Sequence, residues 1–268
     1  MQETTRLIQN PGAHTHISLN GPWKAIVDPY ENGFYNYRYE EHNNGYFRNS
    51  KPRDPSELIE YDFAKSQELV VPGDWNTQDE KLFLYEGTVW YQRDFSLKKK
   101  TGKRYVIHFG AVNYSAIVYI NGEKAGRHEG GFTPFQFDIS AWLKDGNNFV
   151  VVKVENSRQR DQVPTVNTDW WNYGGITRPV KILELDSTYI ADYFIEYGNA
   201  GKQGISGWVQ LAGNSLQDYG SITLKLPALD IEKELEPDSN GRVKFAFAAR
   251  PALWTPENPV LHEVSLAY

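Results

Sequence analysis

Short runs in which apolar and polar residues alternate recur along almost the whole chain, and helical periodicity is nearly absent. The clearest runs cover residues 105–109 and 116–120, and the second leads directly into Asn121-Gly122. That pair tolerates the positive φ angles of a two-residue hairpin turn. Residues 149–154 are almost continuously apolar, as in a strand buried on both faces. Alternating runs bounded by turn residues predict an all-β chain of sandwiches or barrels.

The character of the pattern changes near residue 185. Beyond it, alternating runs at residues 189–197, 222–226, 243–247 and 264–268 are separated by Gly, Asn, Asp and Ser. Several short strands within about 80 residues indicate an immunoglobulin-like sandwich. A length of 268 residues also fits two domains. We therefore expect one domain in residues 1–187 and a second in residues 188–268.

Residues 28–64 differ from the rest of the first domain. They mix charged residues, Asn, Gly and Pro with many aromatic side chains and show no period. A disordered linker carries fewer aromatic residues than this. We expect a long excursion with little regular structure that packs on the domain through its rings, which include Tyr30, Phe34, Tyr35, Tyr37, Tyr39, Tyr46 and Phe47.

Composition narrows the classes of partner. The net charge is −6 with acids and bases interspersed, and the absence of a basic stripe argues against a nucleic-acid partner. No apolar stretch approaches the roughly 18 residues of a membrane span, so no membrane partner is expected. The eight Trp and seventeen Tyr can fill sandwich cores or present ring faces to sugars. Because the chain has no Cys, disulfides and thiolate metal sites are excluded.

The N-terminus gives little information on compartment. Residues 1–6 lack the apolar segment of a signal peptide. If Met1 replaces a removed signal peptide, the periplasm or secretion is slightly favoured over the cytoplasm. The compartment is otherwise unknown from the sequence.

Searches for catalytic and metal motifs find few candidates. The chain has no G-x-S-x-G elbow, no P-loop and no G-x-G-x-x-G fingerprint. The spacing of His14 and His16 puts two imidazoles on one face of a strand, but a polar terminal strand is the favoured interpretation. His128 and Glu129 precede Gly130-Gly131, which favours a structural turn over a reactive pair. No cofactor and no metal are expected.

Residues 168–179 hold the densest group of polar and aromatic side chains. Asp169 offers two acceptor oxygens suited to sugar hydroxyls, and the rings that follow can wall a site. Gly174-Gly175 permits close approach of the backbone. The alternative is a Trp-rich loop folded onto the sandwich, with Arg178 paired to an acid. From spacing alone, both remain open.

Several motifs stand in a characteristic order. V-P-G-D-W-N occupies residues 71–76, Y-E-G-T-V-W-Y-Q-R-D-F follows at 85–95, and W-N-Y-G-G-I-T-R-P-V ends the series at 171–180. These motifs resemble the opening domain of family 2 glycoside hydrolases, which include β-glucuronidases, β-galactosidases and β-mannosidases. The resemblance extends from residue 19 onward, through residues 118–122, 130–135, 138–139 and 146–148, and into the second domain at 253–261.

The resemblance implies an architecture. The first domain would be a jelly-roll, galactose-binding-like sandwich and the second an immunoglobulin-like β-sandwich. In the family, a third domain, a (β/α)₈ barrel, performs retaining hydrolysis with two Glu residues. Such a barrel needs roughly 250 residues. We therefore expect this chain to be a non-catalytic N-terminal part that does not hydrolyse glycosides alone, with no catalytic residue of its own. Its partner would be a β-glycoside held jointly with the barrel, and the full-length protein could form a homo-oligomer.

The resemblance also implies a set of substrate-binding residues. Asp169 matches the family residue whose loop reaches the barrel mouth and hydrogen-bonds the sugar. Trp170, Trp171, Asn172 and Tyr173 would position that loop or line the pocket rim. The loop at residues 85–87 would border the same mouth. For Trp90 and Tyr91, core packing is the favoured role.

Departures from the family pattern bear on the substrate. The stretch at residues 85–93 is closest to β-glucuronidases, which usually carry Phe-Phe and Ala-Gly where this chain has Trp170-Trp171 and Gly174-Gly175. The loop between Asn156 and Asp169 is also shorter than theirs. Glucuronidase and galactosidase therefore remain competing predictions. A free-standing carbohydrate-binding module and a purely structural scaffold are alternative functions for the domain pair.

Overall fold

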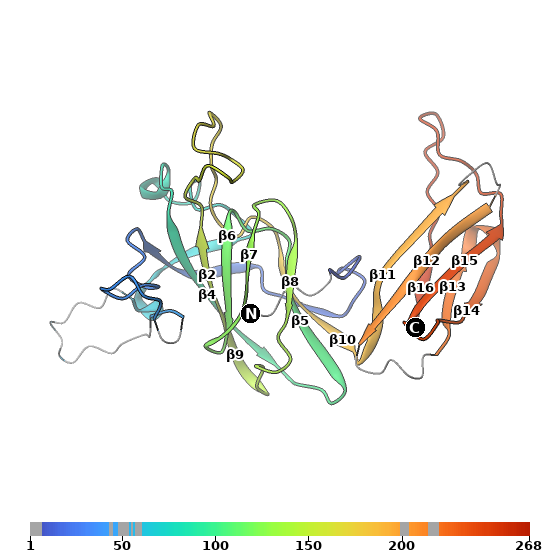
Figure 1. The fold of residues 1–268 in the computed structure, drawn as a ribbon, viewed down its shortest axis with the longest axis horizontal. Helices are drawn as coiled ribbons and strands as arrows, with labels where there is room; N and C mark the ends of the chain where they lie inside the picture. Colours follow the sequence, from blue (N-terminus) through green and yellow to red (C-terminus); the bar gives the residue numbers. More distant parts are fainter. Residues whose placement is uncertain are drawn as a thin grey trace. The chain divides into compact units, whose positions relative to one another are not determined.

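The computed structural model describes residues 7–42, 45–47, 54, 56, 61–198, 204–213 and 220–268, so the N-terminal residues 1–6 lie outside its described part. Regular structure in these residues is β-strand apart from short 3-10 turns, which confirms the all-β prediction (Figure 1). The chain divides into two compact units. Unit 1 contains Gly12–Glu184, and unit 2 combines a segment ending at Pro11 with Leu185–Tyr268. The domain boundary expected at residues 187/188 stays a prediction.

Unit 1 contains two antiparallel sheets. Four strands form the smaller sheet in the order β1-β10-β5-β8, with bounds His16–Ser18, Val180–Asp186, Lys103–Phe109 and Phe135–Asp138. Six strands form the larger sheet in the order β3-β2-β4-β9-β6-β7, with bounds Gln67–Val71, Gly21–Asp28, Thr88–Leu97, Gly146–Glu155, Ser115–Ile120 and Glu123–Glu129. The hairpin between β6 and β7 turns at Asn121 and Gly122, whose φ angles are +52° and +93°, as the sequence predicts.

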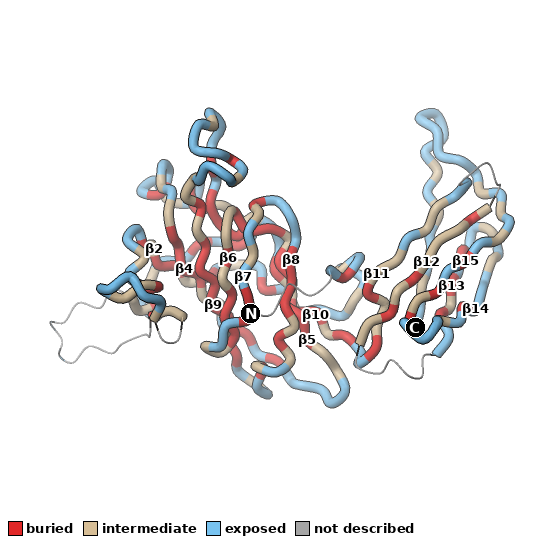
Figure 2. Tube along the Cα trace, viewed as in Figure 1, coloured by how far each residue is buried: buried red, intermediate tan, exposed pale blue. Residues whose placement is uncertain are grey.

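The main core of unit 1 takes side chains from both sheets. Its largest members are fully buried rings, including Trp23, Trp75, Tyr91, Tyr105, Phe109, Phe135 and Phe137. The buried and exposed positions along the chain can be followed in Figure 2. In β4 the side chains alternate between the two faces, so Tyr91 joins this core while Trp90 belongs to a second cluster. Both residues are buried, which confirms their expected role in packing.

The second cluster shows how the 28–64 excursion packs. Phe34, Phe47 and Phe63 are buried against Trp90 and Tyr119 of the larger sheet. The buried Asp28 carboxylate accepts hydrogen bonds from Trp90 Nε1 at 2.9 Å, the Tyr61 hydroxyl at 2.8 Å and the Gly33 N–H at 2.9 Å. The prediction that the rings of the excursion pack on the domain is confirmed for Phe34, Tyr35, Tyr46 and Phe47. It is wrong for Tyr30, Tyr37 and Tyr39, which are 79%, 86% and 84% exposed. The excursion's one regular element here is the 3-10 turn η1, Phe63–Lys65.

Unit 2 also has two antiparallel three-stranded sheets. The first has the order β11-β12-β15, with bounds Thr188–Tyr197, Gly204–Gly213 and Arg242–Ala248. The second has the order β14-β13-β16, with bounds Ile231–Leu235, Ile222–Leu226 and Ser265–Ala267. A separate apolar core includes Val209, Ile222, Leu224, Val243 and Phe245. No helix in the described part of the chain has the length and apolar character needed to cross a membrane.

Candidate functional site

The predicted sugar-contacting segment belongs to the long loop between β9 and β10. Its C-terminal part is fixed to unit 1 by backbone hydrogen bonds. Asn113 and Gly175 exchange two bonds of 2.9 and 3.1 Å, and the Trp75 N–H donates to the Gly174 carbonyl at 2.9 Å. The V-P-G-D-W-N motif thus lies against the Y-G-G motif, which is about 100 residues away in sequence. The loop therefore leaves the sandwich from a rigid base.

Gly174 and Gly175 are required by this close packing. A Cβ added at Gly174 would lie 2.0 Å from Cζ2 of the buried Trp75 ring. Gly175 has a φ of +138°, and a Cβ there would lie 2.7 Å from the Gly73 carbonyl oxygen. The prediction that the glycine pair permits a close backbone approach is confirmed, and the approaching groups are Trp75 and Gly73.

Four buried asparagines connect the loops around this base. The Asn76 side chain donates to the Leu82 and Tyr85 carbonyls at 3.0 and 3.1 Å and accepts from the Gly174 N–H at 2.9 Å. Asn156 accepts from the Gly87 N–H at 2.9 Å. Because a side-chain amide carries both donors and an acceptor, such an asparagine can join two loops that share no secondary structure. The four residues are Asn76, Asn113, Asn156 and Asn172.

Asn172 lies beneath the loop and not on its outer face. Only 4% of the residue is exposed. Its Nδ2 donates to the Asn156 carbonyl at 2.6 Å, and its Oδ1 accepts from Asn113 Nδ2 at 3.2 Å. In return Asn156 Nδ2 donates to the Asn172 carbonyl at 2.9 Å. These contacts match the predicted role of Asn172 in positioning the loop, and Asn172 also lines the hollow that the loop forms.

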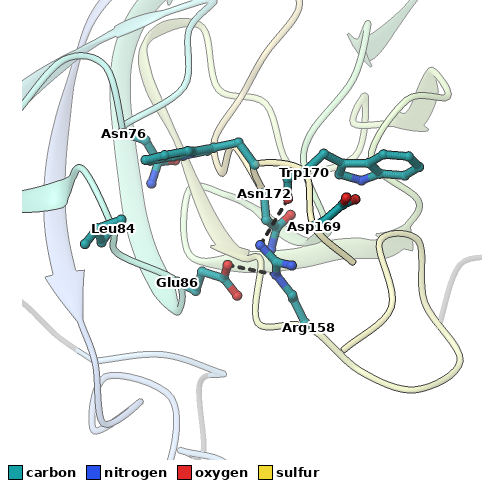
Figure 3. Close-up of a pocket in the computed structure, with 8 residues that line it drawn as sticks. Asn76, Leu84, Glu86, Arg158, Asp169, Trp170 and Asn172 are labelled. Carbon is teal, nitrogen blue, oxygen red and sulfur yellow. Dashed lines mark hydrogen bonds and ion pairs between the residues drawn. The ribbon is translucent and has the colours of Figure 1, made fainter. Parts of the chain in front are cut away.

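Above this base the loop forms a hollow of about 150 Å³, drawn in Figure 3. Asp169 is exposed and lines it. Among the residues that the structure describes, its carboxylate has no hydrogen-bond or ion-pair partner, so both oxygens are free to accept. Glu86 lines the same hollow, as expected of the 85–87 loop, but its carboxylate is bound by Arg158 at 2.9 Å. The lining residues are Asn76, Leu84, Glu86, Arg158, Asp169, Trp170, Trp171 and Asn172.

Aromatic rings flank Asp169 on the outer surface. Trp170 is 63% exposed, Trp171 38% and Tyr173 46%. The Trp171 ring lies 4.6 Å from the Phe83 ring and 6.0 Å from the Tyr173 ring, measured between centroids, and it stacks on the latter. Both tryptophans line the hollow, whereas Tyr173 is outside it. Exposed ring faces beside a free carboxylate can bind a pyranose through its C–H face and its hydroxyls.

The histidines considered as reactive or metal-binding residues make contacts that are typical of structural residues. The His128 ring stacks on Phe135 with centroids 4.2 Å apart, and burial lowers the pKa of His128 below its ordinary value. Gly130 has a φ of +131°, in keeping with the predicted turn. His16 is the first residue of β1, and its Nδ1 lies 2.9 Å from the carbonyl oxygen of His14, which precedes the strand. Within the described ranges, no group of three His, Cys, Asp or Glu side chains is placed to hold a metal ion.

Sequence reasoning missed the residues that support the loop. Asn76 was visible only as the last residue of the V-P-G-D-W-N motif, and Asn156 only as the residue after an apolar strand. No feature of the sequence marked Arg158 as a residue that supports the loop, because a single Arg in a polar loop is usually solvated. Arg178, considered as a partner for an acid, is exposed and has no ion pair with any described residue.

Comparison with known proteins finds one matching family model, that of the glycosyl hydrolases family 2 sugar binding domain, over residues 17–186. Among curated proteins, a β-galactosidase of Thermoanaerobacter pseudethanolicus is 31% identical over 235 residues, which is 80% of this chain and 31% of that protein. A putative β-glucuronidase of Formosa agariphila is 26% identical over 216 residues, 76% of this chain and 26% of that protein.

Solved structures agree in fold. The β-glucuronidase of Ruminococcus gnavus has a TM-score of 0.71 at 25% identity and is matched over 99% of this chain and 44% of that one. A β-glucuronidase of an uncultured Clostridium has a TM-score of 0.72 at 22% identity, over 99% of this chain and 45% of that one. The chain thus spans about a quarter to a third of the curated relatives named above and under half of these structures.

Proposed function

The chain belongs to glycoside hydrolase family 2, and from that premise we propose that it acts in β-glycoside hydrolysis by holding the sugar, with Asp169 as the hydrogen-bond acceptor for its hydroxyls. The observation that carries the proposal is the free, exposed Asp169 carboxylate in a hollow beside Trp170 and Trp171. A carboxylate with two open oxygens can accept bonds from two neighbouring hydroxyls of one ring.

The proposed substrate class follows from the relatives. Those compared above are described as β-glucuronidases and a β-galactosidase, so we propose a terminal β-linked glucuronate or galactose. The catalytic carboxyl pair of the family resides in a (β/α)₈ barrel, and the described residues of this chain form sandwiches. We therefore expect the 268-residue chain to show no hydrolysis of chromogenic β-glucuronides or β-galactosides.

Weak sugar binding by the chain is the direct test. A single carboxylate and one ring face are expected to give a dissociation constant in the millimolar range, about −4 kcal/mol. Saturation-transfer NMR detects contacts of that strength. We expect signals from the ring protons of methyl β-D-glucuronide or methyl β-D-galactoside, and loss of those signals in Asp169→Ala.

Asp161→Ala is the matched control, because Asp161 is an exposed acid of the same loop that does not line the hollow. Equal signals from wild type and Asp169→Ala would refute the proposal and favour a purely structural scaffold. Micromolar affinity by calorimetry would instead favour a free-standing carbohydrate-binding module. The three functions therefore give three different results.

A further inference from the structure

Arg158, which lines the hollow, binds two separate chain segments. Its Nε donates to Glu86 Oε1 at 2.9 Å and its Nη2 to the Trp170 carbonyl at 3.3 Å (Figure 3). Its Nη1 donates to the Thr168 carbonyl at 2.6 Å. The Arg158 side chain is 20% exposed and that of Glu86 is 35% exposed. One guanidinium thus joins the loop before β4 to the loop after β9.

The two carbonyls that Arg158 binds belong to the residues on either side of Asp169. Holding the Thr168 carbonyl fixes the peptide group that precedes Asp169, and holding the Trp170 carbonyl fixes the peptide group one residue beyond the one that follows it. Both bonds restrict the backbone around Asp169, and with it the direction in which the Asp169 side chain leaves. The Asp169 carboxylate itself is not bound by Arg158 in the structure. Arg158 therefore fixes the position of Asp169 without occupying its acceptor oxygens.

Apart from the packing of the Trp171 ring on Phe83, few contacts order this part of the loop. Between Arg158 and Asn172 most residues are exposed. The backbone hydrogen bonds found within this stretch are long: Gln162 N to Gln159 O at 3.4 Å and Thr168 N to Thr165 O at 3.3 Å. Such bonds are weak and accessible to water. The conformation at Asp169 accordingly depends on the buried Asn172, on the packing of Trp171 and on the Arg158 guanidinium, the last of which binds the carbonyls on either side of Asp169.

We propose that Arg158 is the positioning residue for Asp169, holding the loop in the sugar-accepting conformation before sugar arrives. This inference rests on the proposed function. Only a planar guanidinium presents several N–H groups in a fixed fork, so Lys cannot reach the three acceptors together. Glu86 orients the guanidinium by accepting from Nε. A preordered loop improves affinity because the cost of ordering it is not incurred on binding.

The first test measures loop order without sugar. In Arg158→Ala we expect the ¹⁵N order parameters of the Asp169 and Trp170 amides to fall from about 0.85 to below about 0.6. The order parameters of Arg158→Lys should lie between those of wild type and those of Arg158→Ala. Arg160→Ala is the matched control, because Arg160 is an exposed residue of the same loop, and it should leave the order parameters unchanged. Wild-type order in Arg158→Ala would overturn the proposal.

The second test measures sugar affinity of the full chain by titration in saturation-transfer NMR. We expect Arg158→Ala to weaken the binding of methyl β-D-glucuronide or methyl β-D-galactoside about tenfold, with Arg158→Lys intermediate and the thermal midpoint near that of wild type. If Asp169→Ala abolishes binding but Arg158→Ala binds as wild type does, the positioning role is wrong and the proposed function stands. If wild type binds no sugar while Arg158→Ala still disorders the loop, the proposed function fails and the loop-holding role is supported.

Discussion

Replacing Asn172 by Asp tests the buried base of the loop with a change of one polar atom. The side chain keeps its shape, and its remaining oxygen still accepts from Asn113 Nδ2, which lies 3.2 Å away in wild type. The Nδ2 group that donates to the Asn156 carbonyl at 2.6 Å becomes an oxygen. The new carboxylate oxygen and the Asn156 carbonyl oxygen, both acceptors, then face each other at a position where the wild-type residue is 4% exposed.

The expected cost follows from those contacts. Leaving the buried Asn156 carbonyl without its donor costs about 1–3 kcal/mol, and burying a charge beside it adds to this. We therefore expect Asn172→Asp to lower the free energy of unfolding of unit 1 by about 3 kcal/mol or more near neutral pH. Burial and the facing carbonyl raise the pKa of the new carboxyl in the folded state. The penalty is therefore full above the folded pKa and disappears as pH falls below the unfolded pKa.

Urea unfolding followed by Trp fluorescence measures this change, because Trp23, Trp75 and Trp90 are fully buried in unit 1. Asn167→Asp introduces the same charge at an exposed position of the same loop and is expected to change stability little. Near-wild-type stability of Asn172→Asp at neutral pH, or a loss no greater than that of Asn167→Asp, would show that the asparagine contacts do not anchor the loop.

Two further substitutions test the packing and electrostatics of unit 1. Gly174→Ala would place a methyl group 2.0 Å from the buried Trp75 ring, so we expect a loss of about 1–3 kcal/mol or more by thermal unfolding; a wild-type midpoint would contradict this packing. At Asp138, burial raises the pKa but hydrogen bonds from Ser140 and the ion pair with Arg104 outweigh it, and the net pKa is lowered. Asp138→Asn should therefore lose stability at neutral pH, and the difference from wild type should vanish as pH falls through the folded pKa of Asp138; a pH-independent difference would count against the ion pair.

The strands were largely predictable because the alternation of apolar and polar residues along a strand is a local sequence pattern. A period of two in apolar residues identified residues 105–109 and 116–120, which lie in β5 and β6. Packing of the 28–64 excursion was predictable in part, because burial of rings such as Phe34 and Phe47 is favourable, whereas Tyr37 and Tyr39 are exposed and a tyrosine ring tolerates water through its hydroxyl. Its partners were not predictable, since Asp28 and Trp90 are 62 residues apart.

The contacts that support the candidate site could not be predicted from local sequence patterns. The Asn76 side chain meets the Gly174 N–H across 98 positions of sequence, and Asn156 meets Gly87 across 69. Polar residues in loops have no period, and their burial depends on long-range packing that one sequence does not display. The density of polar and aromatic residues at 168–179 singled out Asp169, and the family resemblance then favoured a sugar-binding role for it. Its contact with sugar stays a prediction.

A crystal structure of the chain soaked with methyl β-D-glucuronide or methyl β-D-galactoside tests the central claim most directly. We predict a pyranose in the hollow beside Trp170, with two hydroxyl oxygens within about 2.5–3.0 Å of the Asp169 carboxylate. A sugar bound elsewhere on the chain, or a hollow left empty at saturating sugar, would contradict the account.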